Sequence, residues 1–221
     1  MNNLFISAVL LPFFLTFLMA CRPDSSKGSV TSQDAISYDT TIKGEWGMKE
    51  PVMTAEQIIA EWPAKPKEIA SAMIEKYGQP DASTDRFLIW YDNGPWKKTI
   101  AGREEIPHDF PMPHTDILEQ FIDYRVPVDK YDDLAEYDGS VMTERTKGVL
   151  SARCDKEEMN FLALNLAHDI ITGKKSVQEA RDFYVTTVKA FKDGVKDPYT
   201  QGLQFTVSTG NTGDKDKPAK M

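Results

Sequence analysis

The stretch DKEEMNFLALNLAHDIIT, residues 155–172, decides the fold class. Asp155 followed by Glu158 is typical of a helix N-terminus, and Gly173 is typical of the residue just past a helix end. At about 100° per residue, apolar side chains cover two faces of this helix and leave a narrow polar wedge. The two faces consist of Met159, Leu162, Ala163, Leu166 and Ile170, and of Phe161, Leu164 and Ile171. A helix that is apolar nearly all round is buried, so we expect it to be central.

Two antiparallel hairpins are predicted on the amino-terminal side of this helix. RFLIWY at 86–91 is typical of a strand, Asn93-Gly94 of a tight turn, and 96–101 of the return strand. Residues 141–146 and 149–153 predict a second hairpin around Lys147-Gly148.

Further helices are predicted from capping residues and from the spacing of apolar side chains. They begin at Thr54, Pro66, Thr115, about Asp129 and Ser176, and the first two end before Pro63 and Gly78. A last strand is expected at 203–207. Because helices and hairpins follow one another without strand-helix-strand alternation, the predicted class is α+β, with antiparallel hairpins and several helices around the helix at about 155–172.

The first 20 residues are predicted to be a signal peptide. Leu4 to Ala20 carries no charge, is just short of a spanning length, and is interrupted by Pro12. Its end, Leu18-Met19-Ala20-Cys21, resembles the lipobox of bacterial lipoproteins. The resemblance implies cleavage before Cys21 and acylation of that cysteine, with palmitate among the chains, so that a soluble domain is tethered to a membrane. An uncleaved N-terminal anchor is the alternative, and both place the domain outside the cytoplasm.

Composition divides the remaining chain into three parts. Residues 21–45 are rich in Ser, Thr, Asp and Gly and predict a flexible spacer, 46–207 a single α+β domain, and 208–221 a disordered tail. Arg22 follows the cysteine, whereas in the sorting known for such lipoproteins an aspartate there retains the protein at the inner membrane. We therefore expect the cell envelope, with the outer membrane favoured over the inner membrane.

The acidic balance excludes one class of partner. The formal net charge is −8, and the leader contributes no charged side chain to it. Nucleic-acid binding needs a clustered basic surface, so we expect no nucleic acid partner. The sequence has 2 cysteines, and if Cys21 is acylated, Cys154 has no disulfide partner. Cys154 is then a buried small side chain, a nucleophile or a metal ligand.

Three histidines are the candidates for a metal site. His108 and His114 flank Asp109-Phe-Pro-Met-Pro113, and Asp116 follows. A proline-braced loop can present such ligands rigidly, although the spacing matches no named zinc signature, and a plain structural connection is the alternative. In the central helix, Asp169 lies in the polar wedge and His168 at the edge of an apolar face, where a core histidine with satisfied hydrogen bonds is the alternative to a metal ligand. If the loop folds over them, then His108, His114 and His168 converge with Asp109, Asp116 or Asp169 on a divalent ion such as Zn, with water available for hydrolysis.

Two other catalytic arrangements have weaker support. His168-Asp169 is similar to the His-Asp pair of metal-dependent phosphohydrolases, but those are wholly helical and two hairpins are predicted here. Cys154 with His168 is a possible thiol-imidazole dyad on residue type alone. The candidate catalytic residues are thus His168, Asp169 and Cys154.

The first hairpin is the candidate binding surface. Trp90, Trp96, Lys97 and Arg103 combine aromatic and basic side chains, as binding surfaces for glycans and partner proteins do, although alternate burial in a core is the other interpretation. The opening helices with Lys76-Tyr77-Gly78-Gln79-Pro80 resemble the helix-helix-hairpin lipoproteins of the outer-membrane barrel-assembly machinery. The run 105–126 resembles only bacterial proteins of unassigned function.

The functional prediction is therefore an envelope lipoprotein whose soluble domain binds a partner, either an envelope protein or a glycan. The alternative is a metal-dependent hydrolase that uses His108, His114 and His168.

Overall fold

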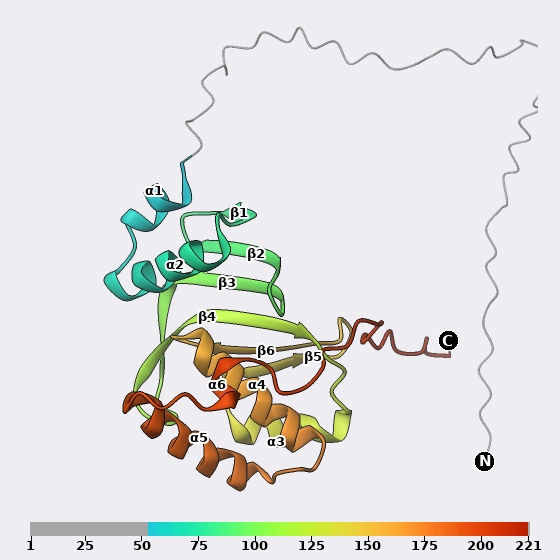
Figure 1. Ribbon diagram of the computed structural model, residues 1–221. Helices are drawn as coiled ribbons and strands as arrows, with labels where there is room; N and C mark the ends of the chain where they lie inside the picture. Colours follow the sequence, from blue (N-terminus) through green and yellow to red (C-terminus); the bar gives the residue numbers. More distant parts are fainter. Residues whose placement is uncertain (1–52, 221) are drawn as a thin grey trace, which may run out of the picture. The chain divides into compact units, whose positions relative to one another are not determined.

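A six-stranded antiparallel sheet in the order β1-β2-β3-β4-β6-β5 organises the described part of the chain (Figure 1). The computed structural model describes residues 53–220, which belong to one compact unit, 50–221. The strands are β1 (Ala82–Ser83), β2 (Phe87–Asn93), β3 (Trp96–His108), β4 (His114–Asp123), β5 (Val141–Glu144) and β6 (Val149–Cys154). Strands next to one another in the sheet are antiparallel throughout.

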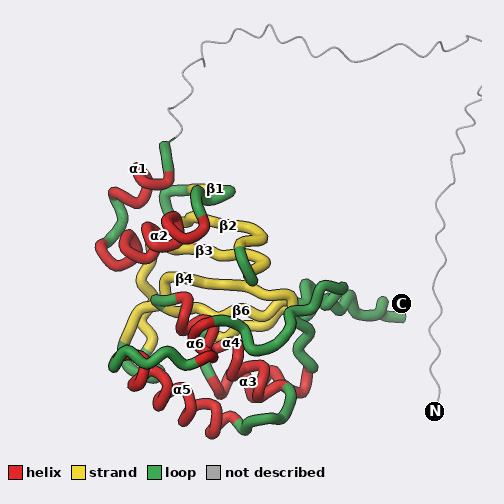
Figure 2. Tube along the Cα trace, viewed as in Figure 1, coloured by secondary structure: helices red, strands yellow, loops and turns green. Residues whose placement is uncertain are grey.

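Helices cover one face of this sheet (Figure 2). They are α1 (Ala55–Ala60), α2 (Ala64–Tyr77), the 3-10 turn η1 (Val128–Lys130), α3 (Tyr131–Tyr137), α4 (Glu157–Ile171), α5 (Val177–Lys192) and α6 (Pro198–Gln201). Helix α2 packs on β3 and α4 packs on β6, while α3, α5 and α6 contact α4 from outside. The α+β prediction, with α4 as the central helix, is confirmed.

Local capping explains where several helices begin. Thr54 and Ser176 each accept a hydrogen bond from the backbone N–H three residues ahead, and each forms a capping box. Gly78 stops α2 with a φ of 80°. The box expected from Asp155 and Glu158 does not form, because α4 starts after Lys156 without a side-chain cap.

Two clusters of buried side chains form the core on the helical face of the sheet. The larger one joins α4 to α5, β4 and β6, and Leu162, Leu164 and Leu166 of α4 are fully buried in it. The smaller one joins α1 and α2 to β2 and β3 through residues such as Ile69, Leu88 and Trp90.

Residues 115–122 form a strand, so the prediction of a helix there was wrong. Ile117, Leu118, Phe121 and Ile122 have the spacing of a helical face, but β4 lies in the middle of the sheet and is buried along much of its length. The alternation that identifies a strand is hidden because Asp116 and Gln120, both polar, point to the buried helical face beside Leu118 and Ile122.

The carboxyl-terminal expectations also need correction. Residues 203–207 form no strand; Asn165 holds this segment by accepting from the Gln204 N–H at 2.7 Å. The tail expected to be loose contacts the β5–β6 turn, where the Thr212 hydroxyl donates to the Gly148 carbonyl at 2.7 Å and Arg145 pairs with Asp214 at 2.9 Å. Thr212 is only 6% exposed, so this segment is part of the domain surface.

The signal peptide, the lipobox at Cys21 and the spacer lie outside the described residues. Within residues 53–220, no helix is both long enough and apolar enough to cross a bilayer.

Candidate metal site

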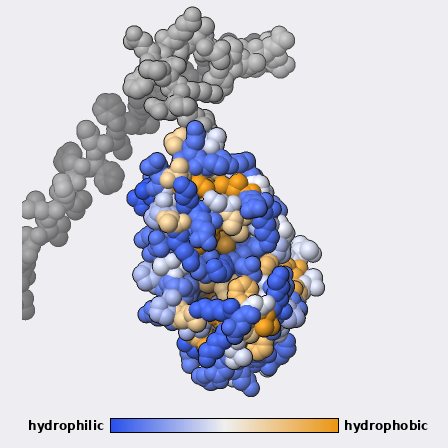
Figure 3. Space-filling model, turned by 60° about the vertical axis from the view of Figure 1, so that its left-hand side comes forward, coloured by the Kyte–Doolittle hydropathy of each residue, from blue (hydrophilic) through white to orange (hydrophobic). Residues whose placement is uncertain are grey.

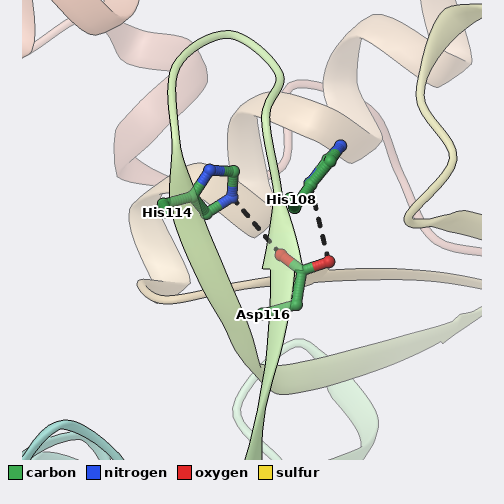
Figure 4. A group of neighbouring side chains, drawn as sticks. All are labelled: His108, His114 and Asp116. Carbon is green, nitrogen blue, oxygen red and sulfur yellow. Dashed lines mark ion pairs between the residues drawn. The ribbon is translucent and has the colours of Figure 1, made fainter.

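Strand pairing brings His108 and His114 together. They are directly opposite each other at the ends of β3 and β4, with ring centroids 4.9 Å apart. Asp116, two residues further along β4, points to the same face as His114 because strand side chains alternate. Figure 4 shows the three side chains converging beside the β3–β4 loop.

A register shift in β3 is essential to this arrangement. Ala101 pairs with Leu118, but between Ala101 and Ile106 the register changes, and Ile106 then pairs with Asp116. In the register of the Ala101–Leu118 pair, Glu105 would lie opposite His114. The irregularity therefore places a histidine where a glutamate would otherwise be.

The donor atoms lie near the spacing that a small metal ion requires. His114 Nε2 lies 3.3 Å from Asp116 Oδ1, and His108 Nδ1 lies 3.5 Å from Asp116 Oδ2. One donor atom from each of the three residues can be chosen so that all lie within 4.8 Å of one another. With Zn–N and Zn–O bonds of about 2.0–2.1 Å, the edge of a tetrahedron is roughly 3.3 Å. Small shifts of these side chains would thus complete a coordination shell.

The contacts of His114 fix which of its ring nitrogens can bind a metal ion. Its Nδ1 lies 2.9 Å from the carbonyl oxygen of Met112, which is only an acceptor, so Nδ1 carries the proton. In the neutral ring, Nε2 then faces Asp116 Oδ1 with a lone pair. Two acceptors at this distance need a proton or a cation between them. A backbone carbonyl bound to the far ring nitrogen is also the usual support of a metal-ligating histidine.

The carboxylate of Asp116 is buried and incompletely satisfied. It is 1% exposed, and Oδ1 has no hydrogen-bond partner among residues 53–220. Oδ2 accepts from the hydroxyl of Ser140 and lies 3.7 Å from Arg153 Nε. An uncompensated buried carboxylate oxygen is costly, and the only positive charge that faces Oδ1 within residues 53–220 is that of a protonated His114, whose Nε2 lies 3.3 Å away.

Electrostatics in the metal-free site favour a charged His114. Its ion pair with Asp116, and after that its contact with Cys154, raise its pKa to about 11. Burial acts to raise the pKa of Asp116, but His114, Ser140 and His108 together keep it below its ordinary value. Burial raises the pKa of Asp138, whose Oδ1 lies 3.6 Å from His108 Nε2. A proton on His114 and a metal ion thus compete for the same place.

The site borders a cavity of about 720 Å³ between the β3–β4 loop, α4 and α5. His114 and Cys154 both line it. Cys154 is not suited to a thiol-imidazole pair, because both ring nitrogens of His114 already face an oxygen, and burial raises the pKa of the thiol. The dyad expected between Cys154 and His168 is not formed, since Cys154 contacts His114 instead.

His168 and Asp169 belong to a different part of the fold, so a three-histidine site was the wrong expectation. The His168 ring bonds through Nδ1 to the Tyr124 hydroxyl at 2.8 Å and stacks on Phe205. Asp169 pairs with Lys174 and Lys175 and accepts from Tyr199. Both have structural partners. Asp109 is exposed in the β3–β4 loop and is not one of the three converging residues.

The expected binding surface on the first hairpin does not form. Trp90 is 2% exposed and Trp96 1%, because both point toward the helices. Lys97 pairs with Asp123, and Arg103 donates to the carbonyl of Glu61. The opposite face of the sheet carries exposed Phe87, Tyr91 and Met142 instead. In the view of Figure 3 the surface is mostly hydrophilic, with hydrophobic side chains in limited areas.

Two residues around the site were not identified from the sequence. Ser140 and Asp138 come from the end of α3 and the start of β5, and nothing in their local pattern distinguishes them from ordinary turn residues. Only the pairing of β6 with β4 brings their neighbourhood to Asp116.

Comparison of the chain with models of protein families, with curated proteins and with solved structures finds no match.

Proposed function

We propose that the protein is a metal-dependent hydrolase of the cell envelope, tethered by a lipidated cysteine. The observation that carries the proposal is the convergence of His108, His114 and Asp116 on one point, where the buried carboxylate of Asp116 faces a nitrogen of each histidine. Binding of an envelope partner stays a prediction, and the metal site has the stronger geometric support.

The choice of Zn²⁺ follows from the ligand types. Two imidazole nitrogens and one carboxylate oxygen suit zinc, with other divalent transition metals as competitors. Three protein ligands leave a fourth position for water, which is the pattern of catalytic rather than structural zinc sites. Zinc brings the pKa of such a water to about 7, so that hydroxide is available at neutral pH. The neighbouring cavity, which His114 lines, provides room for a substrate.

The test is metal content and zinc affinity. The chain from Arg22 onward contains the whole compact unit of residues 50–221 and is purified without a histidine tag. After removal of metal by a chelator and titration with Zn²⁺, we expect one ion per chain and a higher melting temperature. His114→Ala is expected to abolish this binding. His168→Ala is the matched control, because it removes a histidine outside the site and should leave the stoichiometry at one.

Two outcomes would contradict the proposal. A chain that binds no Zn²⁺, Mn²⁺ or Co²⁺ and shows no change in melting temperature has no metal site. Equal loss of binding in His114→Ala and His168→Ala would place the metal elsewhere or indicate a general loss of folding, and circular dichroism of both variants separates these two causes.

The membrane tether is tested independently at Cys21. The sequence Leu18-Met19-Ala20-Cys21 supports acylation, and the full chain expressed in a bacterium should incorporate radioactive palmitate. Cys21→Ser should lose the label, whereas Cys154→Ser should keep it. A label that persists in Cys21→Ser would refute the lipidated tether.

A further inference from the structure

The cavity beside the metal site combines a basic rim with an apolar wall. Lys65, Lys156 and Lys192 line it, and Asp155 is the one acidic side chain among its lining residues in the described part of the chain. Asp155 pairs with Lys65 at 2.8 Å and lies 3.8 Å from Lys156. Three ammonium groups around one carboxylate leave an excess of two positive charges, in a protein that is acidic as a whole.

Lys192 has no anionic partner within residues 53–220. Its Nζ contacts the sulfur of Met112 in the β3–β4 loop, and both residues line the cavity. A thioether is a weak acceptor and carries no charge, so this contact leaves the positive charge of the ammonium uncompensated. The side chain extends from the last turn of α5 at the edge of the cavity and is available to an anion.

The wall of the cavity is apolar. Met159 of α4, Val188 and Phe191 of α5, and Met112 of the β3–β4 loop all line it. Methionine side chains adapt to irregular ligands, and Phe191 offers an aromatic surface. A ligand with an apolar group of moderate size would bury that group here, while its charged end met the lysines and His114.

We propose that the substrate is a phosphate monoester of an apolar alcohol, an inference that rests on the hydrolase proposed above. A phosphate monoester carries about −1.5 to −2 charges at neutral pH, which suits a cavity whose rim carries more ammonium groups than carboxylates. Its apolar group fits the wall formed by the methionines, Val188 and Phe191. A cationic or uncharged ester lacks the negative charge that the lysines would bind, and inorganic phosphate lacks the apolar group that the wall would bury.

The reaction is a hydrolysis and needs no co-reactant besides water. The water oxygen bonds to phosphorus, and the bond between phosphorus and the alcohol oxygen breaks. The proton released by the water passes to the departing alkoxide. The products are inorganic phosphate and the free alcohol.

The test uses phenylphosphonate, which has the charge and the ring of such a substrate but no bond that can be hydrolysed. Isothermal titration of the zinc-loaded chain from Arg22 onward should give one site. Lys192→Ala is expected to raise the Kd about tenfold, since a hydrogen bond to a charged group is lost. Lys189→Ala is the matched control, because this lysine lies on the same last turn of α5 and does not line the cavity. Inorganic phosphate should bind at least about tenfold more weakly than phenylphosphonate, since it buries no apolar surface.

The outcomes separate the two proposals. If zinc binds with one ion per chain but phenylphosphonate does not bind, the substrate class is wrong and the metal site stands. Equal weakening by Lys189→Ala and Lys192→Ala, or equal affinity for inorganic phosphate and phenylphosphonate, would also overturn the substrate class. If no zinc binds, the hydrolase proposal fails, and titration of the same metal-free chain with phenylphosphonate still decides whether the cavity binds the anion.

Discussion

Glu157 stabilises the junction of α2, β3, β4 and α4, and replacing it should strongly destabilise the domain. Its carboxylate is 5% exposed and accepts from Trp96 Nε1 at 2.6 Å, Gln120 Nε2 at 2.9 Å and the Tyr77 hydroxyl at 2.5 Å. Lys76 forms an ion pair with its second oxygen. One buried charge therefore satisfies donors from three other elements.

The expected magnitude follows from the donors left behind. Glu157→Ala leaves the Trp96, Tyr77 and Gln120 donors in the core without an acceptor, and each unsatisfied buried donor costs about 1–3 kcal/mol. Because these costs are not additive, we expect a loss of about 4 kcal/mol in the free energy of unfolding, within the 3–5 kcal/mol typical of a broken buried pair. At about 2–4 °C per kcal/mol, the melting temperature should fall by roughly 8–16 °C. Glu157→Gln keeps the shape and one acceptor, so about 2 kcal/mol is expected.

The pH dependence gives an independent check. Burial acts to raise the pKa of Glu157, but the bonds from Lys76, Tyr77, Trp96 and Gln120 outweigh it and lower the pKa below its ordinary value of 4.5. A carboxyl group whose pKa is lowered by folding stabilises the protein above the pKa of the unfolded chain and loses this contribution as the pH falls. The difference in stability between wild type and Glu157→Gln should therefore be largest above about pH 5 and should shrink toward pH 3.

Urea denaturation followed by tryptophan fluorescence at several pH values measures both effects. The matched control is Glu158→Gln, since Glu158 makes no hydrogen bond or ion pair with residues 53–220, and it should stay within about 0.5 kcal/mol of wild type. A loss below about 1 kcal/mol in Glu157→Ala, or a pH-independent difference for Glu157→Gln, would refute the reasoning.

Three further predictions concern the rest of the domain. Gly148→Ala should lower the free energy of unfolding by more than about 1 kcal/mol, because Gly148 has a φ of +66° and an added Cβ would lie 2.2 Å from the Thr212 carbonyl carbon. Urea denaturation measures this loss, and Gly139→Ala is the control because an added Cβ there meets open space; equal losses in the two variants would contradict the predicted clash with Thr212. Asn165→Ala should cost about 2–4 kcal/mol and expose residues 199–204 to limited proteolysis, since the side chain bonds to the backbone of Tyr199, Gly202 and Gln204; unchanged cleavage would show that the segment is held by other contacts. Ser176→Ala should cost about 1 kcal/mol through loss of the capping box of α5, measured by thermal melting, and Ser208→Ala, which caps no helix, should have no such effect.

Signals carried within a few residues determined much of the secondary structure. Thr54 and Ser176 begin helices because each cap bonds to a backbone group only three residues away. The hairpins around Gly94 and Gly148 follow from positive φ values that glycine adopts without strain. The apolar pattern of 155–172 predicted that α4 is central, because a helix that is apolar nearly all round must be buried. Together these elements already indicated the α+β class.

The tertiary structure alone decided β4 and the site. Asp116 and Gln120 lie on the buried face of β4, where they bond to Ser140 and Glu157, which are distant in sequence. Because these two residues are polar, the strand lacked the alternation of apolar and polar side chains that would have identified it. The position of His108 beside His114 and Asp116 depends on a register shift in β3, whose effect exists only once β3 and β4 pair. The sequence by itself therefore determined most of the helices, both hairpins and the choice of the three histidines as candidate ligands. Which of these histidines meet was decided by strand pairing, because contacts across a sheet depend on register rather than on proximity along the chain.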